Sequence, residues 1–202
     1  LMIASIWGRT EAARVLLEAG AKPNAVDRDG ETALMIAASY GRTKTAKVLL
    51  DGGAEVNARN TAGNTVLILS LMLEGRAATV EVIASAPGVD LNAKNAAGTT
   101  ALMVAAYFGM DVEKLTVLLD KGADKNLAGD FKRYSDDPIL KDYTPLMVAA
   151  TGNNFEGVKI LLSRKVDVNY RGGEGKTALG LAKRHYSSKD LVDLLVAAGA
   201  KE

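Results

Sequence analysis

The stretch ETALMIAASYG at residues 31–41 decides the fold, because close relatives of it recur along the chain. The other copies are LMIASIWG from Leu1, NTVLILSLMLEG from Asn64, TTALMVAAYFG from Thr99, YTPLMVAATGN from Tyr143 and KTALGLAKRHY from Lys176. Their shared leucines fall at Leu1, Leu34, Leu67, Leu102, Leu146 and Leu179, which are 33, 33, 35, 44 and 33 residues apart. Such a period is the sequence signature of a repeat architecture. Six copies account for essentially the whole chain.

Each copy predicts a pair of short helices. A threonine stands before the Ala-rich apolar run, where its hydroxyl can cap the first free N–H groups of a helix. An apolar cluster such as Val48-Leu49-Leu50 predicts a second helix, and the glycine after it, Gly53, is typical of a left-handed helix stop. The fifth copy has Lys165 there, so either a strained residue or a different turn is expected. The connectors are rich in Asn, Asp and Gly, which predicts turns. One helix pair buries too little apolar surface to be stable alone, so the pairs must stack on one another.

The longest irregularity separates the fourth and fifth copies. Gly122 lies 24 residues before Leu146, whereas Gly20 lies 14 residues before Leu34, so ten residues are inserted. The region reads DFKRYSDDPILKDY at 130–143. Its Pro138 favours an irregular excursion over a longer helix.

These motifs resemble ankyrin repeats. The resemblance rests on the 33-residue period, on TALM and TPLM, on LLEAGA, LLDGGA and LLDKGAD, and on the VNA and LNA connectors. It implies an all-α repeat solenoid of six stacked helix-turn-helix units with β-hairpin-like connectors. The resemblance implies a single domain, 1–202, whose first repeat is incomplete. Its repeats span about 1–28, 29–61, 62–95, 96–140, 141–172 and 173–202, with an insertion at 130–141. The histidine of the family's TPLH motif is replaced by Met2, Met35, Met103, Met147, Ile68 and Gly180, so its hydrogen bonds must be absent or replaced, while the methionines fill gaps in the core.

The composition excludes several classes of function. Twenty-five Lys and Arg against 24 Asp and Glu give a net charge of +1, which argues against a protein that binds nucleic acid phosphates. The absence of Cys excludes disulfides and thiolate chemistry. No apolar run approaches the ~20 residues of a membrane span. We therefore expect a soluble protein without a cofactor, either cytoplasmic or exported after loss of an upstream segment.

Motifs for catalysis or metal binding are incomplete. GGEGKT at 172–177 ends like a phosphate-binding loop, but Tyr170 stands where that loop needs a glycine. The single histidine, His185, has no second nitrogen ligand and no serine-centred elbow. We therefore expect no catalytic, cofactor-binding or metal-binding residues and no enzyme, and hydrolase or metal chemistry around His185 is the weakest alternative.

The most informative set of equivalent positions, which we call the column, lies six residues after the shared leucine of each copy. It contains Trp7, Tyr40, Leu73, Phe108, Gly152 and His185, and Tyr107 precedes Phe108. The resemblance implies that this column lines a concave groove together with the connector tips. With helices ~10 Å apart, its apolar members would form a strip across four repeats, and aromatic residues are enriched at binding hot spots. Alternatively, these aromatics only pack against the next connector, and Trp7 covers an open edge.

The connector tips and the insertion extend this predicted contact surface. The insertion carries a basic and aromatic cluster that either recognises a partner or packs as a lid on the fourth repeat. The full set of predicted protein-binding residues is Trp7, Arg28, Asp29, Glu31, Tyr40, Asn64, Leu73, Thr99, Tyr107, Phe108, Phe131, Arg133, Tyr134, Tyr143 and His185.

The sequence therefore predicts a noncatalytic, monomeric protein-binding module whose partner is another protein, with no nucleic acid partner and no membrane span. Binding is expected through the concave groove and the 130–143 loop. The alternative is an inhibitor or regulatory subunit that occludes a partner enzyme's active site.

Overall fold

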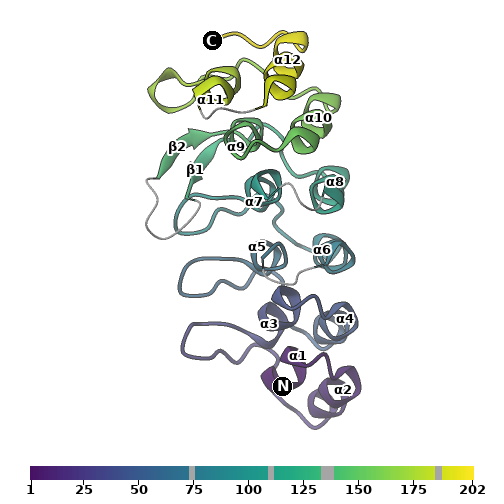
Figure 1. Cartoon of the computed structure of the whole chain (residues 1–202). Coiled ribbons are helices and arrows are strands. Elements are labelled where there is room, and N and C mark those ends of the chain that lie inside the picture. The colour runs from purple at the N-terminus through teal and green to yellow at the C-terminus, as the bar shows by residue number, and fades with distance from the viewer. Residues whose placement is uncertain (73–75, 109–111, 133–138, 185–187) are drawn as a thin grey trace. The chain divides into compact units, whose positions relative to one another are not determined.

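The computed structural model describes residues 1–72, 76–108, 112–132, 139–184 and 188–202. They form two compact units, Leu1–Ala96 (unit 1) and Ala97–Glu202 (unit 2). The described residues include twelve α-helices, one short 3-10 helix and two short strands (Figure 1). The predicted helix-pair repeat is confirmed.

Unit 1 contains three helix pairs. They are α1 (Met2–Ile6) with α2 (Thr10–Glu18), α3 (Ala33–Ser39) with α4 (Thr43–Asp51), and α5 (Val66–Leu69) with α6 (Ala77–Ala84). The first helices α1, α3 and α5 pack in succession, and the second helices α2, α4 and α6 do the same beside them (Figure 1). Each pair therefore shares its core with its neighbour, as a stacked repeat requires.

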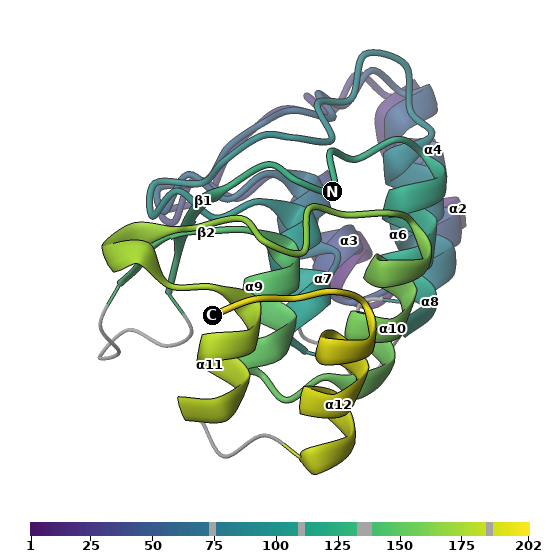
Figure 2. The same cartoon turned by 90° about the horizontal axis from the view of Figure 1, so that it is seen from above.

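Unit 2 contains three more pairs and a small hairpin. Its elements are α7 (Ala101–Tyr107), α8 (Val112–Asp120), β1 (Gly129–Phe131), β2 (Leu140–Tyr143), α9 (Pro145–Thr151), α10 (Phe155–Ser163), the 3-10 helix η1 (Gly173–Gly175), α11 (Ala178–Arg184) and α12 (Lys189–Ala197). The strands pair antiparallel, with an irregular step between Gly129 and Phe131. Figure 2 shows α9 between this hairpin and α10. The described residues on either side of 133–138 are thus two short strands and not a longer helix.

Capping threonines begin the first helix of five pairs, as predicted. Their hydroxyl oxygens accept the backbone N–H three residues later, at 3.1–3.4 Å, and they are Thr32, Thr65, Thr100, Thr144 and Thr177. Each satisfies one N–H group that the helix leaves without a partner. The Sδ atom of Met35 also accepts the N–H of Thr32 at 3.4 Å. This methionine therefore fills the core and supplies a local hydrogen bond where the family histidine is missing.

The second helices end in left-handed residues, also as predicted. The φ angle lies between 73° and 95° at Gly20, Gly53, Gly88, Gly122 and Gly199. Lys165 adopts φ 55° at the corresponding position in unit 2. Of the two expectations for Lys165, the strained residue is therefore correct, because a side chain disfavours this region.

The repeated leucines and alanines form the core of each unit. Leu34, Leu67, Leu102, Leu146 and Leu179 are all buried. Buried alanines such as Ala37 and Ala38 let neighbouring first helices approach closely. In the described part of the chain, no helix has the length and apolar character needed to cross a bilayer.

Candidate interaction surface

Glycine turns fix the ends of the first helices in unit 1. Trp7 is the C-cap residue directly after α1 and is followed by Gly8 at φ 64°, and Tyr40 is the C-cap residue directly after α3 and is followed by Gly41 at φ 62°. Glycine reaches such angles without steric cost, so the chain reverses at once into the second helix. Each aromatic side chain therefore stands at a helix end, where Trp7 is 68% exposed and Tyr40 is half-buried.

Arg42 joins these two helix ends. Its Nε donates a hydrogen bond to the carbonyl oxygen of Ile6 at 2.9 Å, and its guanidinium carbon lies 5.8 Å from the centre of the Tyr40 ring. A Cβ atom on Gly8 would come within 2.9 Å of the Arg42 side chain. The guanidinium therefore covers part of Tyr40 by a cation–π contact, whereas Trp7 stays open to solvent.

The connector tips of unit 1 are rigid turns. The Asp27 carboxylate accepts the N–H groups of Asp29 and Glu31, both at 2.9 Å. Thr61 in the next connector donates its N–H and its hydroxyl to the carbonyl oxygen of Asp29, at 3.0 and 2.9 Å. Neighbouring connectors are therefore held together, and Arg28 and Asp29 remain exposed at the tip.

Two further predicted residues, Glu31 and Asn64, take part in this ladder. Glu31 is half-buried and accepts a hydrogen bond from Asn60 at 3.5 Å. Asn64 is half-buried and accepts one from the Asn95 side chain at 2.8 Å. Glu31 and Asn64 therefore use their side chains in connector contacts, whereas Asp29 contributes its main-chain carbonyl oxygen.

In unit 2 three aromatic rings form a cluster at the end of α7. The Tyr107 ring lies 5.3 Å from that of Phe108, edge to face, and 5.2 Å from that of Phe131. Phe108 is 47% exposed and Tyr107 is half-buried. A Cβ atom on Gly152 would come within 2.9 Å of the Tyr107 carbonyl oxygen. The fifth repeat therefore has glycine in this column because Tyr107 fills the space.

The structure corrects the assignment of three predicted contact residues. Thr99, Phe131 and Tyr143 are buried, with 3%, 3% and 1% of their surface exposed. The Thr99 hydroxyl donates to the carbonyl oxygen of Asp130 at 2.9 Å, and Phe131 packs on Tyr107. Thr99 and Phe131 fasten the hairpin to the rest of unit 2, and the side chains of all three residues are buried. Phe131 therefore packs on the fourth repeat, which was the alternative to recognition of a partner.

Four of the predicted contact residues lie outside the described residues: Leu73, Arg133, Tyr134 and His185. Among the described residues, no group of three or more His, Cys, Asp or Glu side chains is placed to hold a metal ion.

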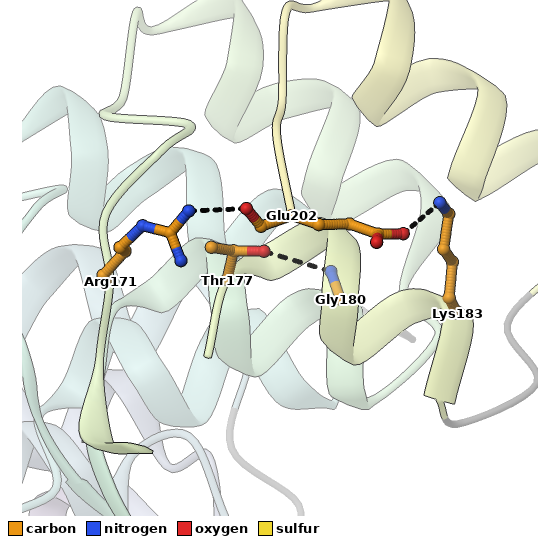
Figure 3. Close-up of polar contacts among 5 residues, drawn as sticks. All are labelled: Arg171, Thr177, Gly180, Lys183 and Glu202. Atoms are coloured by element: carbon orange, nitrogen blue, oxygen red, sulfur yellow. Dashed lines mark hydrogen bonds and ion pairs between the residues drawn. The ribbon is translucent and has the colours of Figure 1, made fainter. Parts of the chain in front are cut away.

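Sequence reasoning missed a pocket beside α11. Its cavity of about 540 Å³ is lined by residues that include Lys176, Thr177, Gly180, Lys183, Arg184 and Glu202, and we call it the α11 pocket. Figure 3 shows Arg171 and Lys183 reaching Glu202 from opposite sides, with the Thr177–Gly180 hydrogen bond between them. The one sequence feature that could have indicated this pocket is Gly180, because the other repeats have Met or Ile at the same position.

An ion pair at the rim of this pocket shifts two pKa values. Lys176 Nζ lies 2.8 Å from a carboxylate oxygen of Glu174. This contact raises the pKa of Lys176 and lowers the pKa of Glu174. Burial raises the pKa of the neighbouring Tyr143 phenol. Lys176 and Lys183, two of the cations that line the pocket, are therefore each paired with a glutamate.

Comparisons with known proteins agree with this architecture. A family model described as "Ankyrin repeats (3 copies)" matches residues 1–95 and 102–202. The human ASB11 ankyrin repeat domain is similar in structure, with a TM-score of 0.81 and 26% identity over 99% of this chain and 83% of that one. The ankyrin repeat domain of Bcl-3, a member of the IkappaB protein family, has a TM-score of 0.81 and 24% identity over 99% of this chain and 86% of that one.

A search of curated proteins found no significant sequence match. The family model covers nearly all of the sequence, and helix pairs, threonine caps and left-handed turns recur in both units. The chain belongs to the ankyrin repeat family.

Proposed function

We propose that this chain is a noncatalytic protein-binding module that contacts its partner through exposed aromatic helix ends and connector tips. Ankyrin repeat domains are generally protein–protein interaction modules. In unit 1 the proposed contacts are Trp7, Tyr40, Arg28 and Asp29. In unit 2 they are Tyr107 and Phe108. The partner is another protein.

The exposure of Trp7 carries the proposal. This indole ends a helix whose preceding residues Ala4 and Ser5 are buried, yet 68% of its own surface faces solvent. A tryptophan side chain buries 150–250 Å² when covered and is among the residues most enriched at binding hot spots. Because the helix end and the Gly8 turn fix its backbone, little conformational freedom is lost when a partner covers it.

The connector tips supply a polar rim next to this aromatic anchor. Arg28 and Asp29 are exposed at a turn that the Asp27 carboxylate and Thr61 hold in place. Interfaces commonly combine an apolar centre with a polar, solvent-accessible edge. Preformed turns also reduce the ordering cost of binding.

Phe108 plays the corresponding part in unit 2. Tyr107 supports its ring edge to face, and the buried Phe131 supports Tyr107 from the hairpin. Such edge-to-face contacts hold aromatic rings in defined positions. Phe108 is therefore a braced apolar side chain that remains 47% exposed.

The proposal can be tested by affinity capture from the native lysate, followed by mass spectrometry and by measurement of Kd with each purified partner. Three chains are compared: the unaltered protein, Trp7→Ala/Phe108→Ala, and the control Val196→Ala. Val196 is an exposed apolar residue of α12 outside the proposed contacts. Circular dichroism checks that all three are folded.

We expect Trp7→Ala/Phe108→Ala to weaken binding to a specific partner at least about ten-fold, because hot-spot truncations cost 2 kcal/mol or more. Val196→Ala should bind like the unaltered chain. If the double variant binds every captured partner with unchanged Kd, the proposed contact residues are wrong.

A further inference from the structure

Asn154 begins α10 and also reaches the end of a neighbouring helix. Its side-chain oxygen accepts the N–H of Gly157 at 2.8 Å and thereby caps α10. Its Nδ2 donates a hydrogen bond to the carbonyl oxygen of Ala106 at 2.7 Å. Ala106 lies in the last turn of α7, directly before Tyr107, where helix carbonyl groups have no partner within their own helix. One side-chain amide therefore joins the start of α10 to the end of α7.

Two glycines leave room for this connection. A Cβ atom on Gly157 would come within 2.2 Å of the Asn154 amide nitrogen, which is too close for any side chain. A Cβ atom on Gly152 would come within 3.1 Å of the Tyr107 ring. Asn154 itself is buried, with 7% of its surface exposed, so a partner cannot contact it. Any effect of Asn154 on binding must therefore pass through the residues that it holds in place.

Unit 1 has a similar connection at the same repeat position. Arg42 and Asn154 both lie eight residues after the shared leucine of their copy. The Nε of Arg42 donates to the carbonyl oxygen of Ile6 at 2.9 Å, and Ile6 directly precedes Trp7. Two different donors thus hold the end of the first helix of the preceding repeat. In both units the held end carries an exposed aromatic residue, which is Trp7 or Phe108.

We propose that Asn154 is a positioning residue for the aromatic contact at Phe108. Arg42 has the same role for Trp7. This inference rests on the proposed function, in which Phe108 and Trp7 contact the partner. A donor that fixes the last turn of a short helix reduces the backbone freedom that a partner must remove when it covers the aromatic side chain. Loss of the donor therefore weakens binding, although Asn154 touches no partner.

Two substitutions of Asn154 separate positioning from helix capping. Asp and Ser are both favourable N-cap residues, so Asn154→Asp and Asn154→Ser retain an acceptor for α10. Neither replaces the amide donor, because a carboxylate has no N–H and the serine side chain is too short to reach Ala106. Asn154→Ser also avoids a buried charge. The matched control is Asn153→Asp, because the Asn153 side-chain oxygen accepts the N–H of Ser188 at 3.0 Å and an aspartate keeps that acceptor.

Amide hydrogen exchange, measured by NMR on the full chain, reports on the helix end without any partner. The N–H of Phe108 donates to the carbonyl oxygen of Val104 at 3.3 Å, and the N–H of Val104 donates to that of Thr100 at 3.2 Å. We expect both Asn154 variants to exchange the Phe108 amide about five-fold faster, the effect of losing one ordinary hydrogen bond, with exchange at Val104 unchanged. Asn153→Asp should change neither rate. A role in stability alone would accelerate both amides together.

The same measurement applies to unit 1. The N–H of Trp7 donates to the carbonyl oxygen of Ile3 at 3.3 Å. Arg42→Met removes the donor to Ile6, whereas the control Lys44→Met removes an exposed cation two positions later. We expect faster exchange of the Trp7 amide only in Arg42→Met. Equal rates in the two variants would overturn the role of Arg42.

Binding is measured as the Kd for one protein purified by the affinity capture that tests the proposed function, and circular dichroism checks each fold. We expect both Asn154 variants to bind about three-fold or more weakly than the unaltered chain, and to have little further effect in combination with Phe108→Ala. An unchanged Kd for Phe108→Ala alone would instead contradict the proposed function, while the exchange rates would still test the hold on α7. The proposal is overturned if the folded Asn154 variants leave exchange at Phe108 unchanged, accelerate Val104 equally, or weaken binding as much with Phe108→Ala as without it.

Discussion

The phenol of Tyr170 donates a bifurcated hydrogen bond to both carboxylate oxygens of Asp142, at 3.0 and 3.1 Å. This contact links the last connector to β2. Nearby, a Cβ atom on Gly172 would come within 2.3 Å of the Asp142 carbonyl oxygen, so the two segments also touch through their backbones. Asp142 itself adopts φ 59°. The hydrogen bond therefore holds a strained strand residue against its neighbour.

We predict that Tyr170→Phe lowers the free energy of unfolding by about 1 kcal/mol at neutral pH, the typical contribution of a hydrogen bond. Urea unfolding followed by circular dichroism measures this change. Tyr40→Phe is the control, since the Tyr40 contact with Arg42 uses the ring rather than the hydroxyl. An unchanged stability of Tyr170→Phe would show that the contact is energetically neutral.

The same residue predicts a pH dependence. Burial raises the pKa of Tyr170 above its ordinary value of 10.0, and the hydrogen bond to Asp142 raises it further. The folded chain therefore holds the phenolic proton more tightly than the unfolded chain. This stabilisation is fully present below the ordinary pKa and is lost as pH rises through the raised pKa.

We expect the unfolding free energy of the unaltered chain to fall more steeply than that of Tyr170→Phe as pH rises above about 10. Urea titrations across this range measure the two slopes. Parallel slopes would contradict the raised pKa of Tyr170.

Lys165 offers a stabilising substitution. It adopts φ 55°, where five other repeats have glycine at the end of the second helix. A side chain in this region costs ~1–2 kcal/mol, and part of the gain from glycine is offset by greater freedom in the unfolded chain. We predict that Lys165→Gly raises the unfolding free energy by about 0.5–1 kcal/mol. Lys165→Ala removes the charge but keeps Cβ, so it should not raise the unfolding free energy. Equal effects of the two variants would count against backbone strain at this position.

The threonine caps make a further energetic prediction. The Thr100 hydroxyl accepts the N–H of Met103 at 3.3 Å and Thr100 is buried. Thr100→Ala should cost about 1 kcal/mol of stability, because the first turn of α7 loses its cap. Thr100→Ser keeps the acceptor and should cost less. The reverse order in thermal and urea unfolding would mean that the methyl group, and not the cap, matters.

Phe131 and Phe108 should respond very differently to truncation. Phe131 of β1 is buried against Tyr107, so Phe131→Ala is predicted to lower the unfolding free energy by ~3–5 kcal/mol. Phe108 is half-exposed, so Phe108→Ala should cost about 1 kcal/mol or less. Urea unfolding of the two variants provides the comparison. Similar losses would contradict the assignment of Phe131 to the core and Phe108 to the surface.

Local and repeated features could be predicted from the sequence. Thr32 and Thr100 cap helices because each lies directly before an apolar run, and Gly53 and Gly122 end helices because the same local geometry recurs. These interactions join residues only a few positions apart. A single copy of the motif is ambiguous, but six copies in register define the helix pairs.

Features that depend on distant residues could not be predicted. The burial of Phe131 and Tyr143 follows from the pairing of β1 with β2, and the insertion between them breaks the repeat register. At the α11 pocket Glu202 contacts both Lys183 and Arg171, and nothing in the local sequence indicates that Glu202 returns to these two cations. Solvent exposure of Trp7 likewise depends on which elements pack beside α1.

The most direct test of partner binding uses Trp7, which is the only tryptophan in the chain. A chain labelled with fluorotryptophan gives one fluorine resonance, which is observed free and with a purified captured partner. We predict that partner binding shifts this resonance and reduces its response to solvent isotope, because the indole leaves water. A resonance that stays unchanged in a saturated complex would contradict the central claim that Trp7 contacts the partner.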